Sequence, residues 1–202
     1  MTADQFLALL GFALATTWTP GPNNVMLAAS GATHGWRRTL PHAMGVALGF
    51  PFMVFAVALG LGEVFEAAPA FRSGLAWLGA AVMLWLAWRI GTARPAAGVD
   101  GEGAQGRPFS FVEAAAFQWV NPKAWVMSIG VSASYVSGIA PVREALLIML
   151  VFMLAGLTSS QAWTASGAAI GRALGTGPRL RLFNATMGVL VAASALWLLL
   201  EA

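Results

Sequence analysis

The sequence contains no cysteine, only two histidines and few charged residues. Without cysteine the chain forms no disulfide and no thiolate metal site, and two histidines are too few for a histidine-rich metal site. Charged residues make up 9% of the 202 residues, whereas hydrophobic residues make up 58%. A soluble domain carries roughly 25% charged residues, so this chain has too few to cover a water-facing surface. The composition therefore predicts an integral protein of a lipid bilayer.

The excess of basic residues is explained better by a membrane protein than by a nucleic-acid-binding protein. The net charge is +3 and the isoelectric point is near 10.6, a value that ordinarily suggests nucleic acid as a partner. Here it depends on few charges, and the arginines fall between apolar runs, so we expect no nucleic-acid partner. The N-terminus lacks the basic stretch of a signal peptide, and its apolar run continues past the length of a signal core. We interpret it as a retained first span.

Apolar runs separated by polar, proline-rich or arginine-bearing stretches predict six membrane spans. They cover roughly residues 5–33, 40–62, 70–92, 109–136, 141–170 and 181–200. A straight span needs about 20 residues, so the first and fourth are too long for a simple straight crossing. Both contain prolines near their centres, and a helix with an unwound middle uses extra residues.

Two proline-centred motifs lie within these long spans. The first is Thr19-Pro20-Gly21-Pro22-Asn23-Asn24, and the second is Asn121-Pro122-Lys123. Proline donates no backbone hydrogen bond and clashes with the carbonyl one turn back, and lipid offers no partner for the freed groups. Helices broken at membrane depth therefore predict a cavity inside the protein, with prolines that only kink their helices as the alternative.

The placement of arginine predicts the orientation of the spans. Eight arginines follow the first, third and fifth spans, namely Arg37, Arg38, Arg89, Arg94, Arg107, Arg172, Arg179 and Arg181. Only Arg72 and Arg143 fall on the other side, and Lys123 lies within the membrane. Because cytoplasmic loops carry the excess of positive charge, the eight-arginine side is predicted to be cytoplasmic and both termini to lie outside.

This orientation also predicts two inverted repeats within a single transporter domain, 1–202. The first three spans begin outside and the last three begin inside, so related halves would be inverted. Repeat one covers about 1–92 and repeat two about 109–202, joined by a linker rich in Gly, Ala and Pro at about 93–108. The predicted fold class is all-α, with six transmembrane helices of which the first and fourth are broken at proline. In transporters of this kind the substrate site lies at the midplane.

The two breaks carry the candidate substrate-binding residues. Each half-helix N-terminus offers unpaired N–H groups and partial positive charge, which suit a carboxylate, and Asn121 is a good N-cap. Lys123 adds a full charge, so we expect this break to hold the anion and the first to be its neutral, polar counterpart. A lysine at mid-bilayer costs about 2.5–3.5 kcal/mol, which favours a cavity-lining role over a partnership with backbone carbonyls. The predicted substrate-binding residues are Pro20, Gly21, Pro22, Asn23, Asn24, Gln118, Asn121, Pro122, Lys123 and Gln161.

Other polar and small residues have more than one interpretation. The run Thr158–Gln161 either lines the cavity or bonds between helices. His42 is either a solvated helix-end residue or a proton carrier, and Glu113, the one acid inside a predicted span, lies near its cytoplasmic end, so no coupling residue is assigned. Gly-x-x-x-Gly motifs, which permit a homodimer without requiring one, begin at Gly31, Gly45 and Gly167.

Taken in order, these motifs resemble the LysE/RhtB family of bacterial amino-acid exporters. The resemblance is carried by Thr19–Asn23, Gly31, Gly35, Arg37, Gly45, Gly49, Phe117–Ala124, Asn184 and Gly188. It implies a multi-pass protein of the bacterial cytoplasmic membrane, without cofactor, that exports amino acids or related metabolites at the expense of the proton-motive force. The stretch 47–52 lacks the acid that exporters of basic amino acids carry, which favours a neutral substrate, and 78–83 lacks a tyrosine common in the family.

The preferred function is therefore a secondary active exporter with a small-molecule substrate. A transporter of another small solute or ion on the same architecture is the alternative, although cation transport requires intramembrane acidic or histidine ligands that the sequence lacks. An intramembrane enzyme is disfavoured because the chain offers no cysteine, no deep histidine and no evident serine–base pair. We expect a transporter and not an enzyme.

Overall fold

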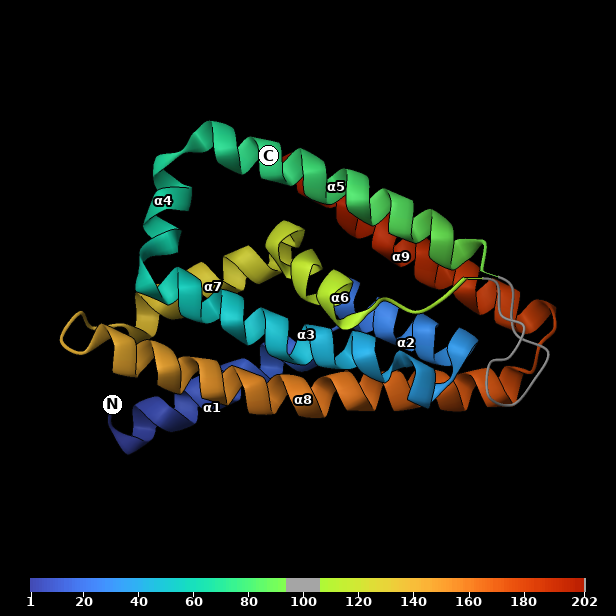
Figure 1. Ribbon diagram of the computed structural model, residues 1–202, viewed down its shortest axis with the longest axis horizontal. Helices are drawn as coiled ribbons and strands as arrows, with labels where there is room; N and C mark the ends of the chain where they lie inside the picture. The colour runs from blue at the N-terminus through green and yellow to red at the C-terminus, as the bar shows by residue number, and fades with distance from the viewer. Residues whose placement is uncertain (94–105, 202) are drawn as a thin grey trace.

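The computed structural model describes residues 1–93 and 106–201 (Figure 1). These residues form helices and connecting turns without any strand, which confirms the all-α fold class. The linker predicted at about 93–108 lies mostly outside the described residues, and Arg94 with it.

The first half of the chain consists of helices, and the predicted break at Pro20–Pro22 separates the first two of them. In order they are α1 (Ala3–Trp18), α2 (Pro22–His34), α3 (Trp36–Ala56), the π-helical turn η1 (Val57–Leu61), α4 (Gly62–Ala67) and α5 (Pro69–Gly91). Thr2 and Gln5 form a capping box that starts α1. α1 ends ahead of Pro20, and α2 begins with Pro22 in its first turn, where proline's missing N–H costs nothing.

The second half repeats this pattern at the Asn121-Pro122-Lys123 motif. Its helices are α6 (Phe111–Phe117), the 3₁₀ turn η2 (Gln118–Val120), α7 (Pro122–Tyr135), α8 (Pro141–Leu174) and α9 (Pro178–Glu201). Ser110 and Glu113 form a capping box at the start of α6. Asn121 caps α7 as predicted, because its side chain accepts a hydrogen bond from the Lys123 N–H at 3.2 Å.

Within residues 1–93 and 106–201, four helices are long and apolar enough to cross a membrane. They are Trp36–Ala67, Pro69–Gly91, Pro141–Leu174 and Pro178–Leu200. The predicted first and fourth spans correspond to α1 with α2 and to α6 with α7, which are shorter because each pair is interrupted at its break. The arrangement of all these segments as six spans in two inverted repeats stays a prediction.

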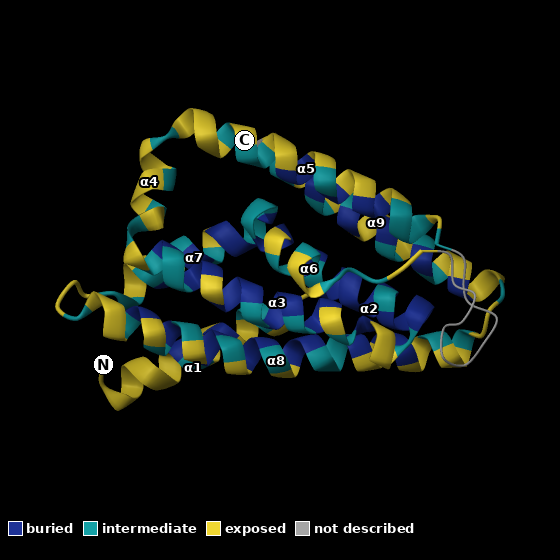
Figure 2. Ribbon diagram, in the orientation of Figure 1, coloured by how far each residue is buried: buried dark blue, intermediate teal, exposed yellow. Residues whose placement is uncertain are grey.

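Helices that lie far apart in sequence pack side by side. α8 lies along α1, α2 and α3, and α5 lies along α9 (Figure 1). The buried residues gather between these helices, whereas the outward faces of α5 and α9 are largely exposed (Figure 2). The exposed side chains there include Trp77, Trp88 and Trp197. Lipid covers such apolar faces in a membrane protein.

Glycines allow the closest of these helix contacts. A Cβ added at Gly167 or Gly171 of α8 would collide with the backbone of α2 at Ala28 or Ala32. In the same way, a Cβ at Gly45 of α3 would collide with the carbonyl of Phe111 in α6. Gly45, Gly167 and Gly171 of the Gly-x-x-x-Gly motifs thus serve packing inside the chain. A homodimer stays a prediction.

The arginines separate in space as they do along the chain. The helix ends that carry Arg37, Arg89 and Arg172 lie together at one end of the molecule (Figure 1). The first turns of α5 and α8, with Arg72 and Arg143, lie at the opposite end. We refer to the former as the arginine-rich end.

Candidate substrate-binding site

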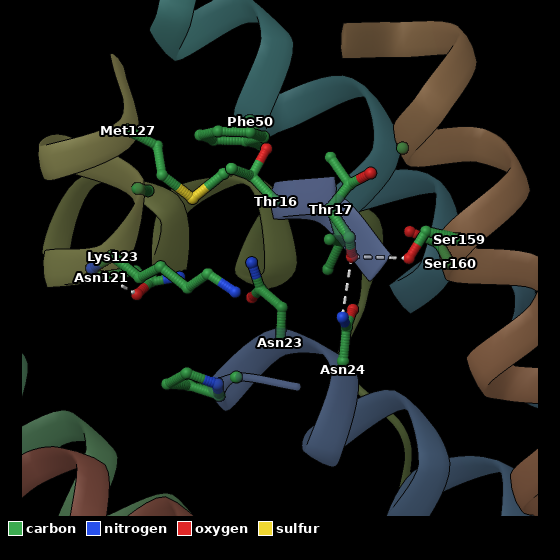
Figure 3. Close-up of a pocket in the computed structure, with 15 residues that line it drawn as sticks. Thr16, Thr17, Asn23, Asn24, Phe50, Asn121, Lys123, Met127, Ser159 and Ser160 are labelled. Atoms are coloured by element: carbon green, nitrogen blue, oxygen red, sulfur yellow. Dashed lines mark hydrogen bonds between the residues drawn. The ribbon is translucent and has the colours of Figure 1, made fainter. Parts of the chain in front are cut away.

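A pocket lies where the two helix breaks meet (Figure 3). We call it the central pocket. It is lined by Thr16, Thr17, Gly21, Pro22, Asn23, Asn24, Val46, Phe50, Asn121, Lys123, Ala124, Met127, Gly156, Ser159 and Ser160. Of the predicted substrate-binding residues, the structure brings six together here: Gly21, Pro22, Asn23, Asn24, Asn121 and Lys123.

The break after α1 leaves backbone carbonyls that side chains from other helices satisfy. The Asn24 amide Nδ2 donates to the carbonyl oxygens of Thr17 and Thr19 at 2.8 and 3.0 Å. The Ser159 hydroxyl of α8 donates to the same Thr17 oxygen at 2.7 Å (Figure 3). The carbonyls of Thr17 and Thr19 are therefore paired within the protein, as backbone at membrane depth requires.

Lys123 reaches from α7 to the first break. Its Nζ donates to the Thr19 carbonyl oxygen at 3.1 Å, and the half-buried side chain lines the central pocket. Gly21 leaves the space for it, because a Cβ added there would lie 3.1 Å from the Lys123 Nζ. The two roles weighed for this lysine, cavity lining and partnership with a backbone carbonyl, occur together.

The unpaired backbone donors belong to the first break and not to the second. At the start of α7, the Lys123 N–H is bonded to the Asn121 side chain, and the N–H groups of Ala124 and Trp125 point to the Asn121 carbonyl. At the start of α2, the N–H groups of Asn23 and Asn24 have no acceptor within the described part of the chain. The groups that could bind an anion therefore come from both helices: α2 provides the unpaired N–H groups, and α7 provides the ammonium of Lys123.

Four predicted residues lie outside the lining of the central pocket. Gln118 is buried and exchanges two hydrogen bonds with Asn23, at 2.8 and 3.2 Å, so it positions Asn23. Gln161 accepts a hydrogen bond from the Trp36 indole at 3.0 Å. Pro122 lines a different cavity beside α5, and Pro20 lines none of those described.

Several lining residues were not predicted from the sequence. Thr16, Thr17, Phe50 and Met127 line the pocket. The two adjacent threonines just before the first break are the one sequence signal that could have identified part of this lining. Within the polar run Thr158–Gln161, Ser159 and Ser160 line the pocket. The Ser159 hydroxyl also bonds between helices, so both interpretations of the run hold.

The central pocket is small in this conformation. Its volume of about 50 Å³ leaves room for about four water molecules. Even a small amino acid has more heavy atoms than that, so the pocket must widen to admit one. Among the described residues no group of three or more histidine or acidic side chains could hold a metal ion.

Comparison with known proteins gives a family and named relatives. The model of a family described as LysE type translocator matches residues 14–202. A cysteine/O-acetylserine efflux protein of Klebsiella pneumoniae is 31% identical over 170 residues, which are 83% of this chain and 84% of the relative. A protein of the same name from Escherichia coli K12 is 36% identical over 136 residues, 66% of this chain and 65% of the relative. No solved structure gives a significant match.

Proposed function

Because the chain belongs to the LysE type translocator family, we propose that it exports neutral amino acids or related small metabolites from the cytoplasm. Membership confirms the resemblance inferred from the motifs and identifies a membrane transporter, not an enzyme. The similar efflux proteins are named for cysteine and O-acetylserine, both neutral amino acids, so these are the first substrates to test. We expect the export to draw on the proton-motive force across a bacterial inner membrane.

The observation that carries the proposed site is the reach of Lys123 to the start of α2. An ammonium has three N–H donors, and one of them is used by the Thr19 carbonyl. The remaining donors, with the unpaired N–H groups of Asn23 and Asn24, suit the two oxygens of a carboxylate. We infer that the substrate carboxylate binds between α2 and α7.

The rest of the lining fits an uncharged substrate. Phe50, Val46 and Met127 offer apolar surface, and Thr16 and Ser160 offer hydroxyl groups. None of the residues that line the pocket is an aspartate or glutamate, so a second positive charge on the substrate would have no partner. This composition supports a neutral amino acid in preference to lysine or arginine.

Transport would follow from rocking of the two repeats about this pocket. The contact of α1 in the first half with α8 in the second has a counterpart in the contact of α6 in the second half with α3 in the first. That correspondence supports inverted repeats, in which alternating access arises by movement of one half against the other. The central pocket is smaller than the two other cavities described here, which fits a step in which the substrate path is closed at its centre.

Replacement of Lys123 tests the function directly. In proteoliposomes, wild type is expected to exchange labelled O-acetyl-L-serine or L-cysteine across the membrane without modifying it. Lys123→Met should lower the rate at subsaturating substrate by about tenfold or more, since it removes a charge-assisted hydrogen bond. Arg143→Met is the matched control, because Arg143 is exposed at the far end of the molecule and should transport normally. Unchanged transport by Lys123→Met would refute the carboxylate site.

A further inference from the structure

A second cavity lies at the arginine-rich end and has polar groups that the proposed transport site does not use. Its volume is about 250 Å³, and it lies between α2, α3, α5 and the segment 106–109. The polar side chains that line it include Ser30, Thr33, His34, His42 and Arg89. We propose that this cavity is a second binding site, for the carboxylate of the exported substrate, which fills before the central pocket does. The proposal rests on the function proposed above.

Arg89 supplies the charge for such a site. No acidic side chain of the described residues pairs with it. Its Cζ lies 4.8 Å from the centre of the Trp85 ring, and its Nη2 donates one long bond of 3.4 Å to the Arg107 carbonyl. Most of its five N–H donors therefore have no acceptor within the described part of the chain, and they keep the fork geometry that matches a carboxylate.

Arg107 lines the same cavity, but its guanidinium is already paired, unlike that of Arg89. Its guanidinium binds both carboxylate oxygens of Glu113, at 2.5 and 2.6 Å, and this pairing raises the pKa of Arg107. Its fork is therefore occupied. Of these two arginines that line the cavity, Arg89 is the one whose geometry leaves it able to bind an anion.

Two buried histidines also lack hydrogen-bond partners here. Nδ1 of His34 and both ring nitrogens of His42 are buried with no partner in the described part of the chain. The His42 ring packs beside Phe109, with 5.4 Å between ring centres. Buried polar groups in native proteins are nearly always paired, so these nitrogens point to a ligand that supplies the missing partners.

The position of the cavity suits a site ahead of the central pocket. Asn23 and Asn24 in the first turn of α2 line the central pocket, and Ser30 and Thr33 line this cavity. Seven residues of α-helix separate Asn23 from Ser30, a rise of about 10 Å. The cavity is larger than the central pocket and has apolar surface from Met26 for an uncharged side chain. A substrate can therefore occupy it while the central pocket is contracted.

The test measures binding to the purified full-length protein after the central site has been removed. Lys123→Met is expected to keep one saturable site for labelled O-acetyl-L-serine. Adding Arg89→Gln should weaken that binding by about tenfold or more, and Arg89→Lys, which keeps the charge but loses the fork, should weaken it less. Arg181→Gln is the matched control, because Arg181 is exposed at the same end but does not line the cavity.

A change in the ligand gives a second measurement that needs no further variant. O-acetylethanolamine, the same molecule without its carboxyl group, should not compete for the site that Lys123→Met retains. The second site would be overturned if O-acetylethanolamine competed as well as unlabelled O-acetyl-L-serine does. It would also be overturned if Lys123→Met bound O-acetyl-L-serine equally well with and without Arg89→Gln. If wild type still exports O-acetyl-L-serine in that case, the proposed function stands. If wild type exports no neutral amino acid, the proposed function fails, and the second site fails with it.

Discussion

At the scale of single residues, the break after α1 is held by three side chains from three helices. Asn24 of α2, Lys123 of α7 and Ser159 of α8 all donate to the carbonyls of Thr17 or Thr19. Each unsatisfied carbonyl at membrane depth costs several kcal/mol. These side chains therefore make the break tolerable and also fix the walls of the central pocket, so the unwound backbone and the site depend on the same bonds.

Loss of the Asn24 amide should destabilise the protein. Asn24→Ala leaves the Thr17 carbonyl with only Ser159 and the Thr19 carbonyl with only Lys123. We expect a loss of about 1–3 kcal/mol, seen as a lower midpoint of thermal unfolding in detergent. Ser160→Ala is the control, because Ser160 lines the same pocket and, among the described residues, its one hydrogen bond outside the helix backbone is made by its carbonyl, which the substitution keeps. Equal midpoints for the two variants would contradict this role for Asn24.

Sequence reasoning identified the backbone motifs of the site better than its side-chain partners. Proline and asparagine at the breaks have local consequences, so Pro22, Asn24 and Asn121 could be placed without a structure. Gln118 and Gln161 could not, because the orientation of a helical side chain depends on how its helix packs. Gln118 faces Asn23, and Gln161 faces Trp36.

At the scale of helices, small residues decide which pairs approach most closely. Gly31 of α2 faces the backbone of α8 at Thr164, and Gly188 of α9 faces the backbone of α5 at Ala87. Contacts of this kind replace the hydrophobic driving force, which is absent between helices in lipid. The close approach of α8 to α2 positions Ser159 beside the break that it helps to satisfy.

A methyl group at Gly167 should disrupt the α2–α8 contact. An alanine Cβ there would fall on the Ala28 carbonyl, so one helix must move. Overpacking of this kind costs about 1–3 kcal/mol, and we expect a lower midpoint of thermal unfolding. The matched control is Gly130→Ala, since Gly130 of α7 has open space around it and alanine favours helix. A Gly167→Ala variant as stable as Gly130→Ala would contradict the packing role.

The helix breaks were predictable and one helix distortion was not. Pro20, Pro22 and Pro122 mark the two breaks because proline acts locally on the backbone. The π-helical turn Val57–Leu61 carries no such mark, because the sequence continues as an apolar run. Gly60 within it has a φ of 115°, a value that glycine adopts readily and other residues rarely do.

At the scale of the whole molecule, the two halves of the proposed inverted repeat differ in packing. α2 packs against α8 and α9, whereas α7, its counterpart in the proposed repeat, borders a cavity of about 380 Å³ beside α5. Arg72, in the first turn of α5, and Trp125, in the first turn of α7, line that cavity. If the repeats exchanged the packed surroundings of α2 and the open cavity beside α7, the substrate path would open on alternate sides of the membrane. The asymmetry is therefore what one conformation of such a transporter would display.

The orientation predicted from arginine placement can be tested because the chain contains no cysteine. Any cysteine introduced is the only thiol of this protein, so labelling of the purified chain by a maleimide that does not cross the membrane reports on that position alone. Ile139 is 90% exposed in the turn between α7 and α8, and Thr176 is exposed in the turn between α8 and α9. If the arginine-rich end is cytoplasmic, Ile139→Cys should react in intact cells, and Thr176→Cys should react only after the membrane is opened.

Labelling of both variants in opened membranes controls for accessibility of the thiols. The opposite pattern in intact cells, with Thr176→Cys reactive and Ile139→Cys protected, would show the reverse orientation. The second cavity, at the arginine-rich end, would then lie on the outer side of the membrane. The second site would then face the side to which substrate is released. The cysteine pattern thus also decides whether the arginine-rich cavity can receive substrate from the cytoplasm, as export requires.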